Sequence, residues 1–414
     1  MRVLLIAFAC EPGRGSEQEV GWRWALELSK HIDITVLTQT RNRNGIENGL
    51  AKLDAYQHNL KFEYLELPRI LYKLKSRFNF LTLPYYAVWL WFAAMKVRTL
   101  HSLHPFQILH HLTFATFRVP IWLKRVGPPV VIGPVGGAER APWPLLAYRC
   151  RPSTWIPEAI RNVMTSIGIA LLRFLPPIYA DRGICLAATP AMLHIFEKQG
   201  LPTRLFPTIG AEGNEINVPR IYEQKCNFLY VGRLHVLKGV QFLLSALADA
   251  RLNDAKLTVV GSGPDEKRLK KQAYEIGIGS RVTWIGQCRR EELPSFYASH
   301  DVVVAPSMYE SGGLVAIEAM EQGIPCIVID VGGHAVSVSA DCGIKIAPEN
   351  SASKVIKDLA NAMLKYKTNI ELRKIHGNNA RTRVRNNYGW QAKTTKILSL
   401  YNYLIDQSEK QLRR

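Results

Sequence analysis

The 414-residue chain lacks the cysteine patterns of disulfide-rich and zinc-binding proteins. Its seven cysteines are scattered, their number is odd, and no two of them form a Cys-x-x-Cys pair. Disulfide frameworks and zinc clusters both depend on cysteines at characteristic short spacings. The sequence therefore predicts neither kind of structure, and a reducing, cytoplasmic compartment suits it best.

The chain also lacks an apolar run long enough to cross a bilayer. The longest such stretch, Phe80–Met95, is interrupted by Pro84 and is shorter than the roughly 20 residues that a spanning helix needs. The first ten residues, MRVLLIAFAC, are apolar, but only Arg2 precedes the run and a glycine-containing loop follows it directly. We expect a buried strand there rather than a secretion signal, and no transmembrane helix.

Acidic residues are absent between Pro68 and Ala138, in a chain whose formal net charge is +19. The nine cations of this segment are Arg69, Lys73, Lys75, Arg77, Lys96, Arg98, Arg118, Lys124 and Arg125. They flank an aromatic stretch that contains Tyr85, Tyr86, Trp89, Trp91 and Phe92. Contact with an anionic membrane surface would explain this combination, and would place the protein at the inner face of the cytoplasmic membrane. A buried helix with a solvated basic rim explains it equally well.

Nucleic acid is not an expected partner despite the positive charge. The sequence contains no helix-turn-helix, zinc-finger or RNP-like pattern. An Asp-x-Asp pair, which can hold a divalent metal, is absent as well. We therefore expect no metal and no other cofactor.

Short apolar runs alternate with helical segments in two successive cycles. The first cycle contains RVLLIAFAC, ITVLTQT from Ile34 and VVIGPVGG from Val130. The second begins after Leu201–Gly213, with strands in FLYVGRLHVLKG, KLTVVGSGPDEKRL, RVTWIGQ, DVVVAPSMYESGG and PCIVIDVGG. Such alternation is typical of parallel sheets covered by helices on both faces.

Two Rossmann-like domains follow from this pattern and from the length, which exceeds what one core usually supports. We expect an N-terminal domain over residues 1–208 and a C-terminal domain over residues 209–388. Residues 389–414 are expected to form a helix that crosses back to the N-terminal domain. Both sheets should present loops at the carboxyl ends of their strands to a cleft between the domains.

Three motifs of the second cycle occur together in a specific order. Gly232-Arg233 precedes Lys238-Gly239, a VVGSGP turn begins at Val259, and Glu310 is followed by Glu318 after seven intervening residues. With these motifs the sequence resembles family 4 of the retaining glycosyltransferases, the group 1 glycosyl transferases of the GT-B fold. The similarity is strong over residues 228–348 and weak over residues 60–180. It implies transfer of a sugar from a nucleotide-diphosphate donor to a saccharide or lipid-linked acceptor, with residues 1–208 as the acceptor domain and residues 209–388 as the donor domain.

The chemistry of that reaction gives the cations a role. Cleavage of the bond between sugar and diphosphate develops negative charge on the phosphate oxygens and positive charge on the anomeric carbon. Without a metal, Arg233 and Lys238 would neutralise the diphosphate as a forked donor and a point cation. The resemblance implies that Glu310 lies near the donor sugar and that Glu318 accepts hydrogen bonds from the ribose hydroxyls.

Other residues are assigned to the donor site by their place in the pattern. The glycines before the predicted helix, Gly312 and Gly313, should offer backbone amides to phosphate or sugar oxygens, with Leu314 and Val315 beginning that helix. At Gly312 the family often has a bulkier residue. In the region that receives the nucleotide base, the candidates are Gly261, Gly263 and Ile285.

In the first cycle, the resemblance makes Gly13 and Gly15 the loop that faces the donor phosphate. A histidine near the transferred sugar would be His110 or His111, and neighbouring strand residues point to opposite faces, so only one can line the cleft. We favour His111. The turn with Gly136, Gly137 and Glu139 either shapes the acceptor side or is purely structural.

Two other functions compete with sugar transfer. A nicotinamide-dependent oxidoreductase could use two Rossmann-like domains, but EPGRGSEQE after the first strand is no convincing dinucleotide fingerprint. A non-catalytic membrane- or glycan-binding protein would account for the charge, although it would not need Arg233, Lys238, Glu310 and Glu318 together. Assembly of a bacterial polysaccharide or other surface glycan is the expected setting.

Overall fold

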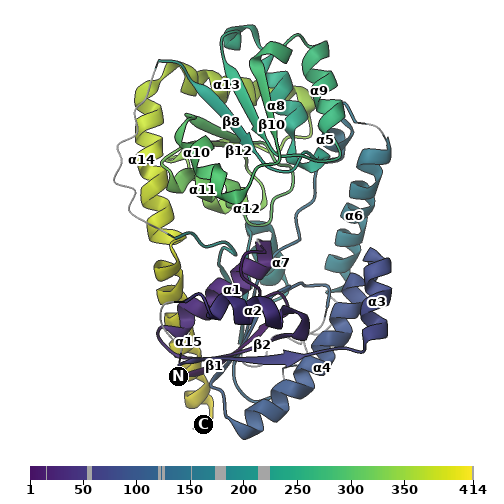
Figure 1. The fold of residues 1–414 in the computed structure, drawn as a ribbon, viewed down its shortest axis with the longest axis vertical. Coiled ribbons are helices and arrows are strands. Elements are labelled where there is room, and N and C mark those ends of the chain that lie inside the picture. Colours follow the sequence, from purple (N-terminus) through teal and green to yellow (C-terminus); the bar gives the residue numbers. More distant parts are fainter. Residues whose placement is uncertain are drawn as a thin grey trace. The chain divides into compact units, whose positions relative to one another are not determined.

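The computed structural model describes residues 1–14, 16–53, 58–119, 123, 126–150, 152–172, 183–212 and 224–412. The chain divides into two compact units (Figure 1). Unit 1 comprises Met1–Gly137, Ile167–Thr208 and Lys393–Arg414, and unit 2 comprises Ala138–Ser166 and Ile209–Ala392. Each unit contains one parallel sheet.

The division differs from the predicted domains in two places. Residues 138–166 were assigned to the N-terminal domain, but they belong to unit 2. The physical reason is burial, because Leu145 and Leu146 are inaccessible to solvent and lie within the hydrophobic core of unit 2. Unit 2 also extends to Ala392, so the last helix returns to unit 1 only from Lys393 onward.

Unit 1 has a seven-stranded parallel sheet with the order β3-β2-β1-β4-β5-β6-β7. Its strands are β1 (Arg2–Ala7), β2 (Asp33–Gln39), β3 (Leu60–Leu65), β4 (Ile108–Thr113), β5 (Val130–Val135), β6 (Gly183–Ala187) and β7 (Thr203–Leu205). The first apolar run of the sequence is thus a buried strand, as predicted. The strand order reverses direction between β1 and β4, which lie side by side.

Helices cover both faces of this sheet. In unit 1 these helices include α1 (Ser16–Ser29), α2 (Arg43–Leu50), α3 (Arg69–Arg77), α4 (Thr82–Leu103) and α7 (Pro190–Lys198). The helix α5 (Trp143–Ala147) and most of α6 (Pro152–Leu171) belong to unit 2. The helix α4 contacts the sheet through buried Tyr86 and Trp89, whose rings pack against Phe8. The last helix, α15 (Trp390–Leu412), packs on the sheet through Tyr401, which is also fully buried.

Unit 2 has a six-stranded parallel sheet with the order β10-β9-β8-β11-β12-β13. Its strands are β8 (Asn227–Val231), β9 (Lys256–Val260), β10 (Val282–Gly286), β11 (Val302–Ala305), β12 (Cys326–Ile329) and β13 (Gly343–Ile346). Its further helices are α8 (Val240–Leu247), α9 (Glu266–Glu275), α10 (Leu293–Ala298), α11 (Leu314–Glu321), α12 (Gly332–Ser337), α13 (Ala352–Thr368) and α14 (Ile370–Asn387). Here the order reverses between β8 and β11.

No helix among the described residues is long and apolar enough to cross a membrane. The aromatic stretch of the acid-free segment lies mostly inside unit 1 rather than on its surface. Tyr85, Tyr86 and Trp89 are buried, whereas Trp91 is exposed and Phe92 is half-buried. Three of the five aromatic residues that motivated the membrane hypothesis are therefore core residues, and Lys124 and Arg125 lie outside the described residues.

Candidate active site

The predicted donor residues gather where the strand order of unit 2 reverses. The neighbouring strands β8 and β11 are followed by the loops that carry Arg233 with Lys238 and Glu310. In open parallel sheets, ligands bind outside the carboxyl ends of the strands at this switch point. The topology therefore assembles, from parts of the sequence that are far apart, the residues that the motifs singled out.

An ion pair joins the two loops. The Nζ atom of Lys238 lies 2.7 Å from Oε2 of Glu310, across a separation of 72 residues. The other carboxylate oxygen, Oε1, accepts a hydrogen bond of 3.2 Å from the backbone amide of Gly313. The ammonium group has three donors, so Lys238 can hold Glu310 and still contact an anionic ligand.

Burial and charge act on Glu310 in opposite directions. Burial of the side chain raises the pKa of this carboxyl, but Lys238, His334 and the Gly313 amide lower it by more, so that the pKa lies below its usual value. His334 is 1% exposed, and its burial lowers its own pKa to about 4. The lowered pKa favours the ionised form of Glu310 near neutral pH.

His334 was not predicted from the sequence, where it follows an ordinary-looking glycine pair. The backbone just before His334 contacts Glu310, since the amide of Gly333 donates a 2.8 Å hydrogen bond to the Glu310 carbonyl. Gly332 has φ +53°, and a Cβ atom there would stand 1.8 Å from that carbonyl oxygen. Two glycines in succession before a histidine are the signal that could have pointed to this approach.

Arg233 is exposed, and none of the described carboxylates pairs with its guanidinium. Lys238 ends a short 3-10 turn that begins at Val236, and the following Gly239 has φ +71°. A Cβ atom at Gly239 would lie 2.0 Å from the carbonyl oxygen of Pro306, in the loop after β11. Gly239 therefore lets the two loops approach closely enough for the ion pair between Lys238 and Glu310.

The glycine loop before α11 is only partly free for a ligand. The amide of Gly313, which was expected to be free, is bonded to Glu310. A Cβ atom at Gly312 would stand 2.6 Å from the Ile209 side chain, so a larger residue there would require that side chain to move. Leu314 and Val315 begin the helix and are half-buried.

Glu318 lies one turn further along α11. Its Oε2 accepts a 3.0 Å hydrogen bond from the Tyr297 hydroxyl, and its Oε1 is 3.7 Å from a guanidinium nitrogen of Arg290. Burial raises the pKa of the Glu318 carboxyl above its usual value. Tyr297, which the sequence analysis did not single out, orients the carboxylate and leaves its remaining acceptor capacity for a ligand hydroxyl.

The turn glycines serve backbone packing. Gly261 has φ +131°, and a Cβ atom there would lie 2.0 Å from the Gly232 carbonyl oxygen. At Gly263 the corresponding distance to the Leu234 carbonyl oxygen is 2.2 Å. These glycines hold the 232–234 loop, and with it Arg233, against the neighbouring turn. Ile285 is 42% exposed on the edge strand β10, where a flat ligand group could cover it.

In unit 1, the two histidines project from opposite faces of β4, as predicted for neighbouring strand residues. His110 contacts the Tyr401 hydroxyl at 2.5 Å and the Gly133 carbonyl at 2.8 Å, and His111 contacts the Tyr86 hydroxyl at 2.6 Å. Both are 1% exposed, and burial lowers their pKa values, to about 4 and about 3 respectively. Both rings therefore lie in the core of unit 1.

Gly13 is exposed with φ +72°, and its amide donates a 2.7 Å hydrogen bond to Glu19. No atom lies within 4 Å of the position that a Cβ would take there, so the glycine serves the turn conformation rather than a close contact. Gly15 lies outside the described residues.

Segment 138–166 contributes side chains to the same loops of unit 2. Arg161 lies over the ring of Tyr309 at 4.0 Å, and its Nε donates a 2.7 Å hydrogen bond to Glu158. Glu158 in turn approaches Nε2 of His235 at 3.7 Å. Tyr309 directly precedes Glu310 in the sequence, and His235 caps the turn that ends in Lys238. These contacts hold the two loops that carry Lys238 and Glu310. No local sequence motif indicated them.

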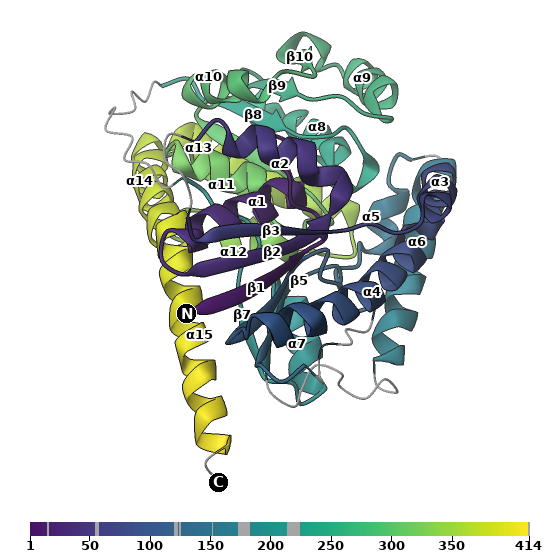
Figure 2. The ribbon, with the colours of Figure 1, turned by 60° about the horizontal axis from the view of Figure 1, so that its bottom comes forward.

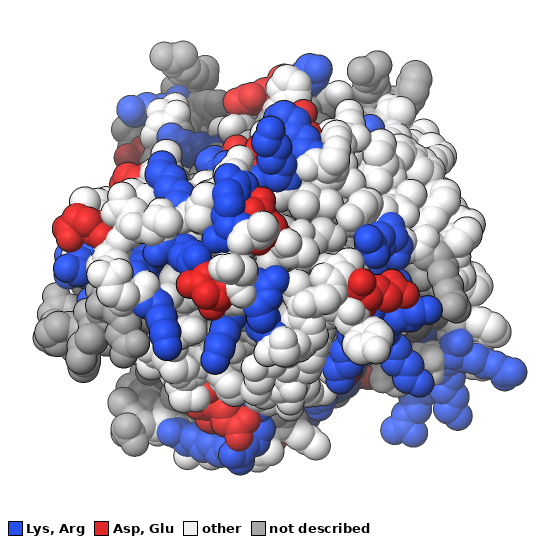
Figure 3. Space-filling view, turned by 90° about the horizontal axis from the view of Figure 1, so that it is seen from above, with Lys and Arg blue, Asp and Glu red and all other residues white. Residues whose placement is uncertain are grey.

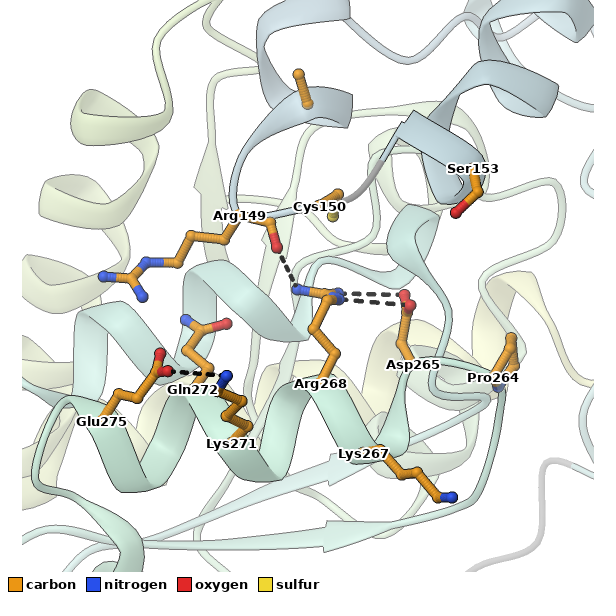
Figure 4. Close-up of a pocket in the computed structure, with 11 residues that line it drawn as sticks. Arg149, Cys150, Ser153, Pro264, Asp265, Lys267, Arg268, Lys271, Gln272 and Glu275 are labelled. Carbon is orange, nitrogen blue, oxygen red and sulfur yellow. Dashed lines mark hydrogen bonds and ion pairs between the residues drawn. The ribbon is translucent and has the colours of Figure 1, made fainter.

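A cavity of about 720 Å³ in unit 2 lies elsewhere (Figure 4). It lies between α9 and the 147–153 stretch, where Arg268 bridges Asp265 and the Arg149 carbonyl. None of the donor residues named above lines it. Among the described residues, no group of three His, Cys, Asp or Glu side chains converges to hold a metal.

Comparison with known proteins places this geometry in context. Residues 212–383 match the family model for glycosyl transferases group 1. An uncharacterized glycosyltransferase of Methanocaldococcus jannaschii is 30% identical over 207 residues, which are 46% of this chain and 52% of that protein. The chain spans about half the length of the curated relatives it matches.

Two solved structures resemble the whole chain. Sucrose-phosphate synthase from Thermosynechococcus elongatus has a TM-score of 0.60 and 22% identity, covering 98% of this chain and 99% of its own. The Anabaena protein HepE in complex with UDP has a TM-score of 0.61 and 18% identity, covering 97% and 100%. The two units have the GT-B fold, and the unit that carries the Lys238–Glu310 pair is similar to the glycosyl transferases of group 1.

Proposed function

We propose that this protein is a retaining glycosyltransferase that moves a sugar from a nucleotide diphosphate to a saccharide or lipid-linked acceptor without a metal. The observation that carries the proposal is the Lys238–Glu310 ion pair at the strand reversal of unit 2, with the exposed Arg233 on the same loop. This site combines cations for a diphosphate with a carboxylate for a sugar. The relatives, which are glycosyltransferases, do not favour an oxidoreductase or a non-catalytic protein.

In the proposed reaction, the bond between the anomeric carbon and the diphosphate oxygen breaks, and the acceptor hydroxyl oxygen bonds to the same carbon from the same side. The hydroxyl proton passes to the departing phosphate. Arg233 and Lys238 stabilise the charge that develops on this phosphate, and the ionised Glu310 stabilises the positive sugar carbon. Glu318 accepts hydrogen bonds from the hydroxyl groups of the nucleotide ribose. Bacterial surface-glycan assembly is the proposed setting.

The donor can be identified by thermal denaturation with a panel of uridine, guanosine and adenosine diphosphate sugars. A ligand at 100 times its dissociation constant stabilises the folded state by about 2.7 kcal/mol, which raises the melting temperature by roughly 5 to 10 °C in a domain of this size. The complex of HepE with UDP makes the uridine series the first choice. If no nucleotide sugar in the panel shifts the melting temperature, the proposal is wrong.

Turnover should persist in a chelator. Two cations are placed to bind the diphosphate without a metal. We therefore expect the rate of nucleotide release in excess EDTA to stay within about twofold of the untreated rate. A metal-dependent transferase would instead lose nearly all turnover and regain it with magnesium or manganese. That second outcome would contradict the role given to Arg233 and Lys238.

Glu318→Gln should weaken donor binding and leave the chemical step nearly unchanged. A hydrogen bond to a charged group contributes about 1.5 to 3 kcal/mol, so the donor KM should rise by roughly 10- to 100-fold with little change in kcat. Glu321→Gln on the same helix is the matched control, and it should behave like the wild type. A lower kcat at unchanged KM would place Glu318 at the reacting sugar instead.

A further inference from the structure

The helix α3 exposes its apolar side chains to solvent. None of its residues is buried. Ile70 is 69% exposed and Leu74 is 46% exposed, and Phe78, directly after the helix, is 41% exposed. These residues are four apart, so they form one stripe along the helix. Arg69, Lys73 and Arg77, also four apart and all exposed, form a basic stripe beside it.

The neighbouring helix α4 adds a second apolar stripe. In both ribbon views α3 lies beside α4, with which it is in contact (Figures 1 and 2). On α4, Val88, Trp91 and Met95 are exposed by 38%, 48% and 43%. Between the two helices, Phe80 is 76% exposed. Exposed apolar residues gathered in this way on a protein surface usually mark a binding site.

The cations of α3 are not neutralised by the protein. Among the described residues, no carboxylate pairs with Arg69, Lys73 or Arg77, and the sequence has no acid between Pro68 and Ala138. Lys96, by contrast, is bound to Glu63 at 2.9 Å and to the Tyr64 carbonyl at 2.7 Å. Basic residues also predominate on the face shown in Figure 3, so charge alone does not single out α3. What distinguishes α3 is the apolar stripe beside its cations.

We propose that α3 and the exposed stripe of α4, together the α3–α4 surface, dock unit 1 on an anionic lipid bilayer. Interfacial helices bury an apolar face at the boundary between headgroups and acyl chains and direct Lys and Arg to anionic headgroups. The two adjacent stripes of α3 match this arrangement. A soluble polyanion would bind the cations but leave Ile70 and Phe80 in water. The proposal is independent of the proposed catalytic function.

Co-sedimentation of the full chain with vesicles tests this proposal. Wild-type protein should sediment with phosphatidylglycerol-containing vesicles and stay in solution with pure phosphatidylcholine vesicles. An Arg69→Gln, Lys73→Gln, Arg77→Gln variant should bind about 100-fold more weakly, since each cation near the surface contributes about a fivefold factor. The matched control, Lys256→Gln, Lys271→Gln, Lys374→Gln, removes the same charge from exposed positions of unit 2 and should bind normally.

A second variant, Ile70→Ser, Leu74→Ser, tests the apolar stripe without changing the charge. It should bind several-fold more weakly, while its unchanged melting temperature shows that it folds. Unaltered binding of this variant would indicate a general polyanion site and overturn the bilayer proposal. So would an equal loss in the unit 2 control, or no sedimentation of the wild type with anionic vesicles.

Discussion

Replacement of Lys238 by alanine is expected to reduce turnover by roughly 30- to 1000-fold, the effect of losing one preorganised charge-stabilising donor. The loss has two physical sources. The leaving phosphate loses a cation, and Glu310 loses the partner that lies 2.7 Å away. An uncompensated, largely buried carboxylate would also shift toward its protonated form. The rate of nucleotide release from the donor found by thermal denaturation measures this effect.

The chain offers a close control for Lys238. Lys345 pairs with Asp330 at 2.9 Å and its side chain is 29% exposed, compared with 31% for Lys238. Lys345→Ala should therefore reproduce any general cost of losing an ion pair in unit 2, with turnover near the wild-type value. If both variants lose turnover equally, the specific role of Lys238 is refuted.

Glu310→Gln is expected to lower kcat by roughly 100- to 1000-fold, with a smaller change in the donor KM. Glutamine is neutral, so it cannot stabilise positive charge on the sugar carbon. It also keeps only one acceptor oxygen, whereas Glu310 accepts from both Lys238 and the Gly313 amide. The measurement is a comparison of kcat and KM for the two proteins, and wild-type kcat in the variant would remove Glu310 from the mechanism.

The same variant should differ from the wild type in acid. The pKa of Glu310 is lowered in the folded state, so its ionisation stabilises the fold above the unfolded pKa of about 4.5. This stabilisation is lost as the pH falls through the lower, folded pKa. Glu310→Gln lacks this contribution, so its melting temperature should fall less steeply than that of the wild type below about pH 4.5. If the melting temperatures of the two proteins fall in parallel with pH, the pKa of Glu310 is not lowered in the folded state.

The sequence predicted best those parts of the fold that depend on local pattern. Continuous apolar runs identified β1, β2, β5, β8, β9, β11 and β12, because strands buried on both faces contain few polar residues. The run RVTWIGQ also identified β10, although this edge strand is partly exposed. The alternation with helices predicted two parallel sheets of the GT-B fold. The shorter β7 and β13 were not predicted, since three or four residues of mixed character have no distinctive period.

Contacts between distant parts of the sequence could not be predicted in the same way. The motifs named Lys238 and Glu310 separately, but only the strand order shows that they form a pair. Nothing in the sequence of segment 138–166 indicated that Leu145 would fill the core of unit 2 or that Arg161 would lie over Tyr309. The aromatic residues of α4 were ambiguous because the same side chains suit a core and a membrane, and Tyr86 proved to be buried against His111.

Calorimetric titration can measure whether Arg233 and Lys238 bind the diphosphate of a nucleotide-sugar donor. UDP and GDP would be titrated in EDTA into the wild type and into an Arg233→Ala, Lys238→Ala variant, with Lys345→Ala as control. We expect saturable binding of one nucleotide to the wild type and to the control, weakened at least about 100-fold in the double variant because two charge-assisted contacts are lost. Equal affinity of the double variant and the wild type would show that these two cations do not bind the diphosphate.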